Sequence, residues 1–175
     1  MYLISACLVG QNCRYNGSNS RIEKLVSLVS QGKAIAVCPE LLGGLTVPRE
    51  PCELITLKGE AKILTKLGAD HTMAFVNGAR KTLEICLNQN IKKAILQPRS
   101  PSCGFGLIYD GTFTGKLTPG NGITSELLAK NDIEVIGPDD WDYLSEKGLG
   151  YNSKDIKDAI LKAKTKKLSN KSKLT

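Results

Sequence analysis

Short apolar runs separated by polar segments recur along the first 140 residues of the chain. Four of these runs are mostly apolar, namely residues 2–10, 34–38, 93–97 and 133–137. A continuous apolar run of this length is typical of a strand that is buried on both faces, as in a parallel sheet. The pattern therefore predicts four buried strands.

The segments between these runs carry apolar residues at helical spacing. One predicted helix ends at Gly32 and has Ser18 or Ser20 as its cap. A longer helix is capped by Asp70, and its apolar side is formed by Met73, Phe75, Val76, Leu83 and Leu87. Another helix follows the Gly-rich turn at residues 120–122. Strand and helix thus alternate along the chain.

Two further segments have the pattern of small hairpins, residues 54–65 around Lys58-Gly59 and residues 108–117. Together with the alternating strands and helices they predict an α/β protein. Its core is a Rossmann-like, mostly parallel sheet of about four strands with flanking helices. Such sheets bind their ligands outside the carboxyl ends of the strands.

Composition adds a division of the chain. With 175 residues and 41% hydrophobic residues, one domain with a proper core is expected. Eight lysines between residues 154 and 175 carry most of the net charge of +7. We therefore predict a main domain over residues 1–150 and a Lys-rich helix and tail over residues 151–175. The tail is interpreted as a solvated segment, with binding to RNA or another polyanion as the alternative.

No apolar run approaches the ~20 residues of a membrane-spanning helix. The N-terminal run also lacks a charged leader and a small-residue cleavage site. A cytoplasmic protein without a membrane partner is expected, and its six cysteines are then expected to be reduced thiols.

Three of the cysteines fall at or just beyond the ends of predicted strands. Cys7 and Cys38 end the first and the second strand, and Cys103 follows the third. Neighbouring strands lie ~4.8 Å apart, so loops at one edge of the sheet can bring three thiols together. By contrast, Cys86 is interpreted as a core residue, and Cys13 and Cys52 as loop thiols without a metal role.

Three thiols without an accompanying histidine leave two kinds of metal centre open. Zinc would be one ligand short of a closed structural site. A [4Fe-4S] cluster usually takes four cysteines, and with three it keeps an exchangeable position on one iron. From the residues alone these two centres remain rivals.

Several motifs occur in order between about residues 3 and 137. They include SACLVG from Ser5, CPELLGGL from Cys38 and SPSCG from Ser100, with GADHT, FVNGA, IYDGTF and GNGIT. Together they resemble the thiouracil desulfurase family. The resemblance implies a [4Fe-4S] cluster held by Cys7, Cys38 and Cys103. It also implies a reaction in which water replaces the sulfur of a thiocarbonyl and sulfide leaves.

In this family a glutamate and a serine near the cluster assist the reaction. By motif the glutamate is Glu40, and the serine is Ser100 or Ser102. Glu40 follows a cluster ligand by two residues, where it can act on a water as general acid or base. The alternative roles are a cap of the following turn for Glu40 and a plain hydroxyl-stabilised turn for the serines.

Six other residues are candidate substrate contacts. The three arginines suit a nucleotide phosphate, the tyrosine suits stacking on a pyrimidine, the asparagine belongs to a turn that could bind an anion, and the aspartate suits a base edge. These residues are Arg14, Arg49, Arg99, Tyr15, Asn121 and Asp70. Surface solvation is the alternative for the arginines, packing is the alternative for the tyrosine, and helix capping is favoured for the aspartate.

The predicted function is an iron–sulfur desulfidase that acts on a thiolated pyrimidine base or nucleotide such as 4-thio-UMP. Some relatives carry an extra C-terminal domain and act on thiouridine in tRNA. This chain has a Lys-rich tail there, which favours a small substrate over intact tRNA. An RNA-directed desulfidase and a non-catalytic metal or redox sensor are the alternatives, and no oligomeric state is predicted.

Overall fold

The fold is that of a computed structural model, which describes residues 1–57 and 59–146. The chain divides into a unit from Met1 to Pro138 and a second unit from Asp139 onward. The predicted Lys-rich helix and tail over residues 151–175 lie outside the described residues. Helix α5 (Pro138–Glu146) is the described part of the second unit. Among the described residues, no helix has the length and apolar character needed to cross a bilayer.

The first unit is built on a four-stranded sheet in which every neighbouring pair is parallel. The strands are β1 (Tyr2–Ser5), β2 (Ala34–Val37), β5 (Lys93–Ile95) and β8 (Glu134–Ile136), arranged in the order β2-β1-β5-β8. Tyr2 is in register with Ala34 on one side and with Lys93 on the other. The predicted parallel α/β fold is confirmed. From β1 the chain passes to β2 on one side of β1 and then crosses to β5 and β8 on the other side. A topological switch point therefore lies between β1 and β5.

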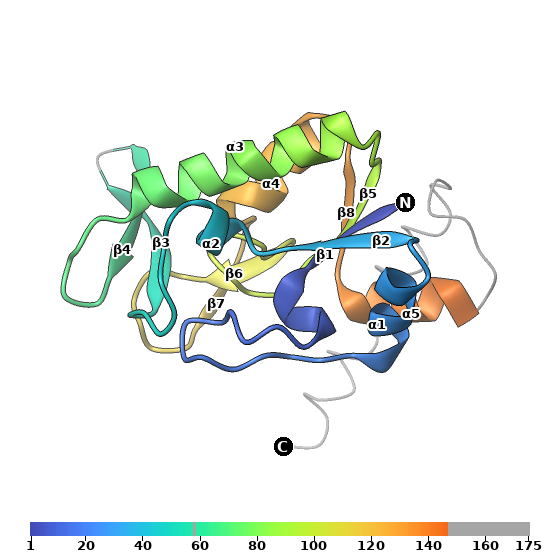
Figure 1. Ribbon diagram of the computed structural model, residues 1–175. Helices are drawn as coiled ribbons and strands as arrows, with labels where there is room; N and C mark the ends of the chain where they lie inside the picture. The colour runs from blue at the N-terminus through green and yellow to red at the C-terminus, as the bar shows by residue number, and fades with distance from the viewer. Residues whose placement is uncertain (58, 147–175) are drawn as a thin grey trace, which may run out of the picture. The chain divides into compact units, whose positions relative to one another are not determined.

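Helices cover both faces of this sheet (Figure 1). The helices α3 (Thr72–Asn88) and α4 (Ile123–Lys130) lie on one face, and α1 (Glu23–Ser30) lies on the other. Two antiparallel hairpins lie within the crossovers, β3 (Cys52–Leu57) with β4 (Glu60–Thr65) and β6 (Leu107–Tyr109) with β7 (Leu117–Pro119). Both predicted hairpins are confirmed.

A short helix, α2 (Pro39–Leu42), follows β2 and lies against α3. A Cβ atom on Gly78 would lie 2.0 Å from the carbonyl oxygen of Pro39, and one on Gly43 would lie 2.1 Å from that of Ala74. Such distances exclude any side chain, so the two glycines let the backbones of α2 and α3 approach closely. This contact fixes the position of α2 at the end of β2.

The first apolar run differs from its prediction as one continuous strand. The strand β1 ends at Ser5, and Ala6–Val9 form a 3-10 turn, η1. The turn closes because Gly10 has a φ of 94°, where its N–H bonds back to the carbonyls of Ala6 and Cys7. Cys7 therefore lies in a turn beyond the strand rather than at its end.

The predicted helix boundaries also need correction. Neither Ser18 nor Ser20 caps α1, which begins at Glu23 after Ile22. The two hydroxyls stabilise the preceding loop instead: that of Ser18 binds Asn16, and that of Ser20 accepts a hydrogen bond from an arginine. In α3, Met73 and Leu87 were expected on the apolar side but are 64% and 55% exposed. They lie at the two ends of the helix, beyond the part that packs on the core.

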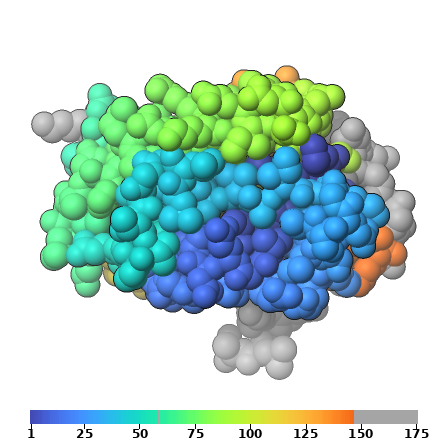
Figure 2. Space-filling view, viewed as in Figure 1, coloured from blue at the N-terminus to red at the C-terminus, as the bar shows by residue number. Residues whose placement is uncertain are grey.

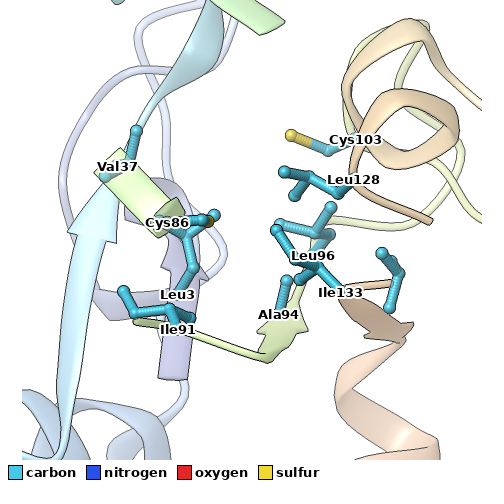
Figure 3. Close-up of a cluster of buried hydrophobic side chains, with 10 residues drawn as sticks. Leu3, Val37, Cys86, Ile91, Ala94, Leu96, Cys103, Leu128 and Ile133 are labelled. Atoms are coloured by element: carbon cyan, nitrogen blue, oxygen red, sulfur yellow. The ribbon is translucent and has the colours of Figure 1, made fainter. Parts of the chain in front are cut away.

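The core between the sheet and the helices on the α3 side contains a cluster of buried apolar side chains (Figure 3). Its buried members are Leu3, Val37, Cys86, Ile91, Ala94, Leu96, Cys103, Leu128, Ile133 and Val135. The prediction that Cys86 is a core residue is confirmed, since it is fully buried. Cys103 lies at one end of the cluster, close to Leu128 in Figure 3. The core thus reaches the segment that follows β5.

Candidate metal centre and active site

A cavity of about 520 Å³ lies beyond the carboxyl ends of β1, β2 and β5. Its walls come from the loop after each of these strands and from the segments 13–15 and 49–53. This is the end of the sheet where the topological switch point lies, between β1 and β5. Because crossover loops diverge at such a point, a crevice forms there without any special sequence.

Cys7, Cys38 and Cys103 all line this cavity, each on the loop after a different strand. Cys7 and Cys103 are buried, and Cys38 is partly buried. Burial raises the pKa of the Cys103 thiol to about 12. The pKa of Cys38 is raised by a hydrogen bond with Cys13 and by burial. The three thiols predicted as ligands are therefore brought to one cavity.

A fourth thiol, Cys13, belongs to the same group. Cys13 lines the same cavity, and its carbonyl accepts a hydrogen bond from the thiol of Cys38 at 4.0 Å. A side-chain interaction with Cys38 lowers the pKa of Cys13, whereas an interaction with Cys7 and burial raise it, to about 11 in total. From the sequence, Cys13 is predicted to be a loop thiol without a metal role. Gly10 and Gly17, on either side of Cys13, both adopt positive φ. These glycines are the sequence feature that indicates a tightly turning loop around Cys13.

The donor set at this cavity suits an iron–sulfur cluster. Cysteine thiolates are the soft ligands that such clusters take. Among the described residues, no three cysteine, histidine or acidic side chains form a group that could hold a single metal ion. A cubane binds each thiolate through a different iron atom, so its ligands need not converge on one point.

Glu40 is held through both of its carboxylate oxygens. The Ser100 hydroxyl donates to Oε1 at 3.3 Å, and the Arg49 guanidinium donates to Oε2. The Ser100 oxygen in turn accepts the N–H groups of Ser102 at 3.0 Å and Cys103 at 3.1 Å. A carboxylate and a hydroxyl are therefore fixed next to a candidate ligand, on the wall of the cavity.

The two candidate serines differ in their surroundings. Ser100 lines the cavity, whereas Ser102 is fully buried and absent from the described lining. The hydroxyl of Ser102 hydrogen-bonds with that of Thr124 at 2.8 Å, and its carbonyl accepts the N–H of Thr124. Ser102 thus joins the turn after β5 to the start of α4, and only Ser100 is placed to act in the cavity.

Four of the six predicted substrate contacts line the cavity: Arg14, Tyr15, Arg49 and Arg99. Among the described residues that line the cavity, the other two, Asp70 and Asn121, do not occur. Asp70 accepts the N–H of Thr72 at the start of α3, and the hydrogen bonds from Thr72 lower the pKa of its carboxyl. Asn121 binds the N–H of Gly106 and the carboxylate of Glu126. For Asp70 and Asn121, substrate contact remains a prediction.

Several lining residues were not singled out from the sequence. Gln97 accepts a hydrogen bond from the Cys7 thiol at 3.5 Å and donates its N–H to the Ser5 hydroxyl. Its position as the last residue of the third apolar run is the available signal. Tyr109 and Phe113 belong to the second hairpin, and Lys66 follows β4. Nothing in their sequence context places them at the ends of the parallel strands.

A parallel α/β protein with thiols, a carboxylate and a hydroxyl around one strand-end cavity has the arrangement of an enzyme site that could hold a metal or cluster. Residues 2–140 match the model of the 2-thiouracil desulfurase family. The chain is 48% identical over 142 residues to the protein YbbK of Bacillus subtilis (strain 168), covering 78% of this chain and 94% of YbbK. The chain belongs to the 2-thiouracil desulfurase family and is an enzyme of that type.

A solved structure agrees with this assignment. The chain is similar to the [4Fe-4S]-dependent thiouracil desulfidase TudS, with a TM-score of 0.76 and 41% sequence identity. The match covers 83% of this chain and 95% of TudS. The family that the sequence motifs resemble is thereby confirmed.

Proposed function

We propose that this chain is a [4Fe-4S]-dependent desulfidase that converts thiolated pyrimidines, such as thiouracil and 4-thio-UMP, to uracil or UMP. Water supplies the oxygen of the new carbonyl and sulfur leaves as sulfide, so the reaction is a hydrolysis without net redox change. The observation that carries the proposal is the Glu40–Ser100 hydrogen bond in a cavity lined by Cys7, Cys38 and Cys103. Similarity to TudS supports it.

Cys7, Cys38 and Cys103 would hold the cluster in this cavity. When bound, the cluster would supply a Lewis acid that polarises the C–S bond and stabilises the departing sulfide. The carbonyl of Cys13 accepts a hydrogen bond from the Cys38 thiol, which holds this loop against one of the three candidate ligands. Because Glu40 lines the same cavity as the three thiols, a pyrimidine bound there would have its thiocarbonyl carbon within reach of that carboxylate.

Glu40 is the general base for the attacking water in this proposal. Its carboxylate is fixed by two partners, so little rearrangement is needed before the proton moves. Ser100 accepts two backbone N–H groups, which favour negative charge on its oxygen and make its hydroxyl a better proton donor. A proton taken by Glu40 can therefore return through Ser100 to the leaving sulfur.

The cavity favours a small substrate with room beyond the base. Its volume of about 520 Å³ is within the range of small-molecule sites. Arg14 and Arg99 lie in its lining and can bind a phosphate, which supports a nucleotide such as 4-thio-UMP. Reduced thiols are also consistent with a cytoplasmic location.

The test begins with reconstitution of the full chain with iron and sulfide in the absence of oxygen. We expect about four iron atoms per chain and sulfide release on addition of 4-thiouracil or 4-thio-UMP. Glu40→Gln should keep the iron but slow sulfide release on the order of 10²- to 10⁴-fold, because it removes the base. A chain that binds one zinc ion instead, or an iron-loaded chain without turnover, would overturn the proposal.

A further inference from the structure

The Arg49 guanidinium connects three separate segments around the cavity. One terminal nitrogen, Nη2, donates to the Glu40 carboxylate and to the carbonyl of Cys13, the latter at 3.0 Å. The other, Nη1, donates to the carbonyl of Thr46 at 3.0 Å. The backbone N–H of Arg49 also donates to the carbonyl of Tyr15 at 2.8 Å. Arg49 is therefore tied to α2, to the loop after β1 and to its own loop.

These contacts lie on a wall where distant segments meet. In Figure 2 the segment after β1, in blue, lies directly against the segment around α2, in lighter blue to cyan. The side chain of Arg49 is only 10% exposed and that of Glu40 15% exposed. At this burial an ion pair is weakly screened, and a planar guanidinium fixes a carboxylate oxygen more strictly than a lysine does.

The geometry points to Arg49 as a positioning residue for the reaction of this site: it holds Glu40 so that the other carboxylate oxygen faces Ser100. The inference rests on the proposed function, in which Glu40 and Ser100 move the proton. Without Arg49, the carboxylate would be free to rotate away from Ser100 and from the water that it activates. A displacement of about 1 Å at a reacting group can cost ~10²-fold in rate.

This role differs from the phosphate contact predicted for Arg49 from the sequence. The same guanidinium nitrogens that would bind a phosphate already donate to Glu40, Cys13 and Thr46. Arg99 also lines the cavity but is exposed, and its backbone φ of 64° is unusual for a residue with a side chain. Arg99 is thus a matched control, an arginine of the same cavity that offers its charge to solvent and to ligands.

The experiment is a double-mutant cycle of Arg49→Met and Glu40→Gln in the iron-loaded full chain, with kcat expressed per loaded cluster. Arg49→Met should lower kcat ~10- to 100-fold while KM changes less than about twofold. In the Glu40→Gln variant, Arg49→Met should lower kcat almost no further, because the carboxylate that Arg49 holds is already replaced. Arg49→Lys keeps the charge and should recover part of kcat.

Binding of the product UMP by calorimetry supplies a readout that is independent of turnover. Arg49→Met should leave the Kd for UMP within about twofold of the wild-type value, whereas Arg99→Met should weaken it and raise KM. A raised Kd in Arg49→Met, with rate effects that add to those of Glu40→Gln, would show a substrate contact and overturn the inference.

Two other outcomes distinguish a failure of the inference about Arg49 from a failure of the proposed function. If both Arg49 variants lose iron while kcat per loaded cluster stays at the wild-type value, Arg49 is merely structural and the inference is wrong. If the iron-loaded wild-type chain releases no sulfide from thiopyrimidines, the proposed function fails and the inference fails with it. If the wild-type chain releases sulfide but the rate effects of Arg49→Met and Glu40→Gln are additive, the inference about Arg49 is wrong and the proposed function still holds.

Discussion

Buried cysteines occur in two regions of the molecule, and their surroundings differ. Cys86, on α3, is fully buried among apolar side chains of the core, and burial raises its pKa to about 11. At the cavity, Cys7 and Cys13 are also almost fully buried, but both line the cavity and the Cys7 thiol donates to the side chain of Gln97. Burial alone therefore does not distinguish a ligand from a core residue.

The two regions differ in the segments of the chain that carry their cysteines. Cys7, Cys38 and Cys103 are carried by loops after three different strands, which meet because the parallel sheet ends there. Cys86 instead lies on α3 within the core; Cys103 belongs to the same apolar cluster, but of the two only Cys103 also lines the cavity. Convergence of several polar or sulfur groups from different crossovers indicates a site, whereas a lone buried thiol is typical of packing.

The strongest test of this difference compares Cys103→Ala with Cys86→Ala. Cys103→Ala should lose most of the iron after reconstitution, and sulfide release should fall by more than ~10²-fold, since a ligand is removed. Cys86→Ala should keep about four irons per chain and full turnover. Its expected cost is about 1 kcal/mol of unfolding free energy, from the lost packing of one sulfur atom.

Iron content, measured together with thermal unfolding of both variants, decides the outcome. Full iron loading in Cys103→Ala would remove Cys103 from the ligand set and leave Cys13 as the candidate that replaces it. Loss of iron in Cys86→Ala with an intact fold would contradict the division into core and cavity thiols.

A smaller effect separates the two serines that flank Pro101. Ser100→Ala should lower kcat about 10²-fold with iron retained, because it removes the hydroxyl bound to Glu40. Ser102→Ala should leave kcat unchanged but lower the unfolding free energy by about 1–3 kcal/mol, since the buried Thr124 hydroxyl loses its partner. Kinetics and chemical denaturation of both variants check this, and reversed effects would exchange their roles.

Sequence patterns predicted the sheet and the sheet edge at which Cys7, Cys38 and Cys103 meet, for a physical reason. Buried parallel strands have to be continuously apolar, so β2, β5 and β8 stand out in the sequence. Once the strands are placed, parallel topology fixes which loops share an edge, and the meeting of Cys7, Cys38 and Cys103 follows. The resemblance of the motifs to the family predicted the iron–sulfur chemistry and the role of Glu40 in the reaction.

The remaining features depend on loop conformation, which periodicity does not encode. The short β1 depends on Gly10 closing a 3-10 turn, and the same turn sets where Cys13 returns to Cys7. The difference between Ser100 and Ser102 depends on the backbone of one turn and on contacts with α4. Likewise, the pairing of Arg49 with Glu40 is a contact between loops that only the folded chain reveals.

The smallest predicted effect concerns the pH dependence of stability at Cys86. Its pKa is raised from an ordinary value of 9.0 to about 11 in the folded chain. Above pH 9 the unfolded chain therefore loses this proton more readily than the folded chain, and stability falls as pH rises toward 11. Between pH 8 and pH 10 the thiol should cost the wild-type chain about 1 kcal/mol of unfolding free energy.

Denaturant titrations of the wild-type chain and of Cys86→Ala at pH 8 and pH 10 isolate this contribution. Other titrating groups change both proteins alike, and the packing cost of the substitution is independent of pH. The wild-type chain should therefore lose about 1 kcal/mol more than Cys86→Ala over this interval. Equal losses in the two proteins would mean that the Cys86 thiol titrates alike in the folded and unfolded chain, and that the core around it admits a charged thiolate.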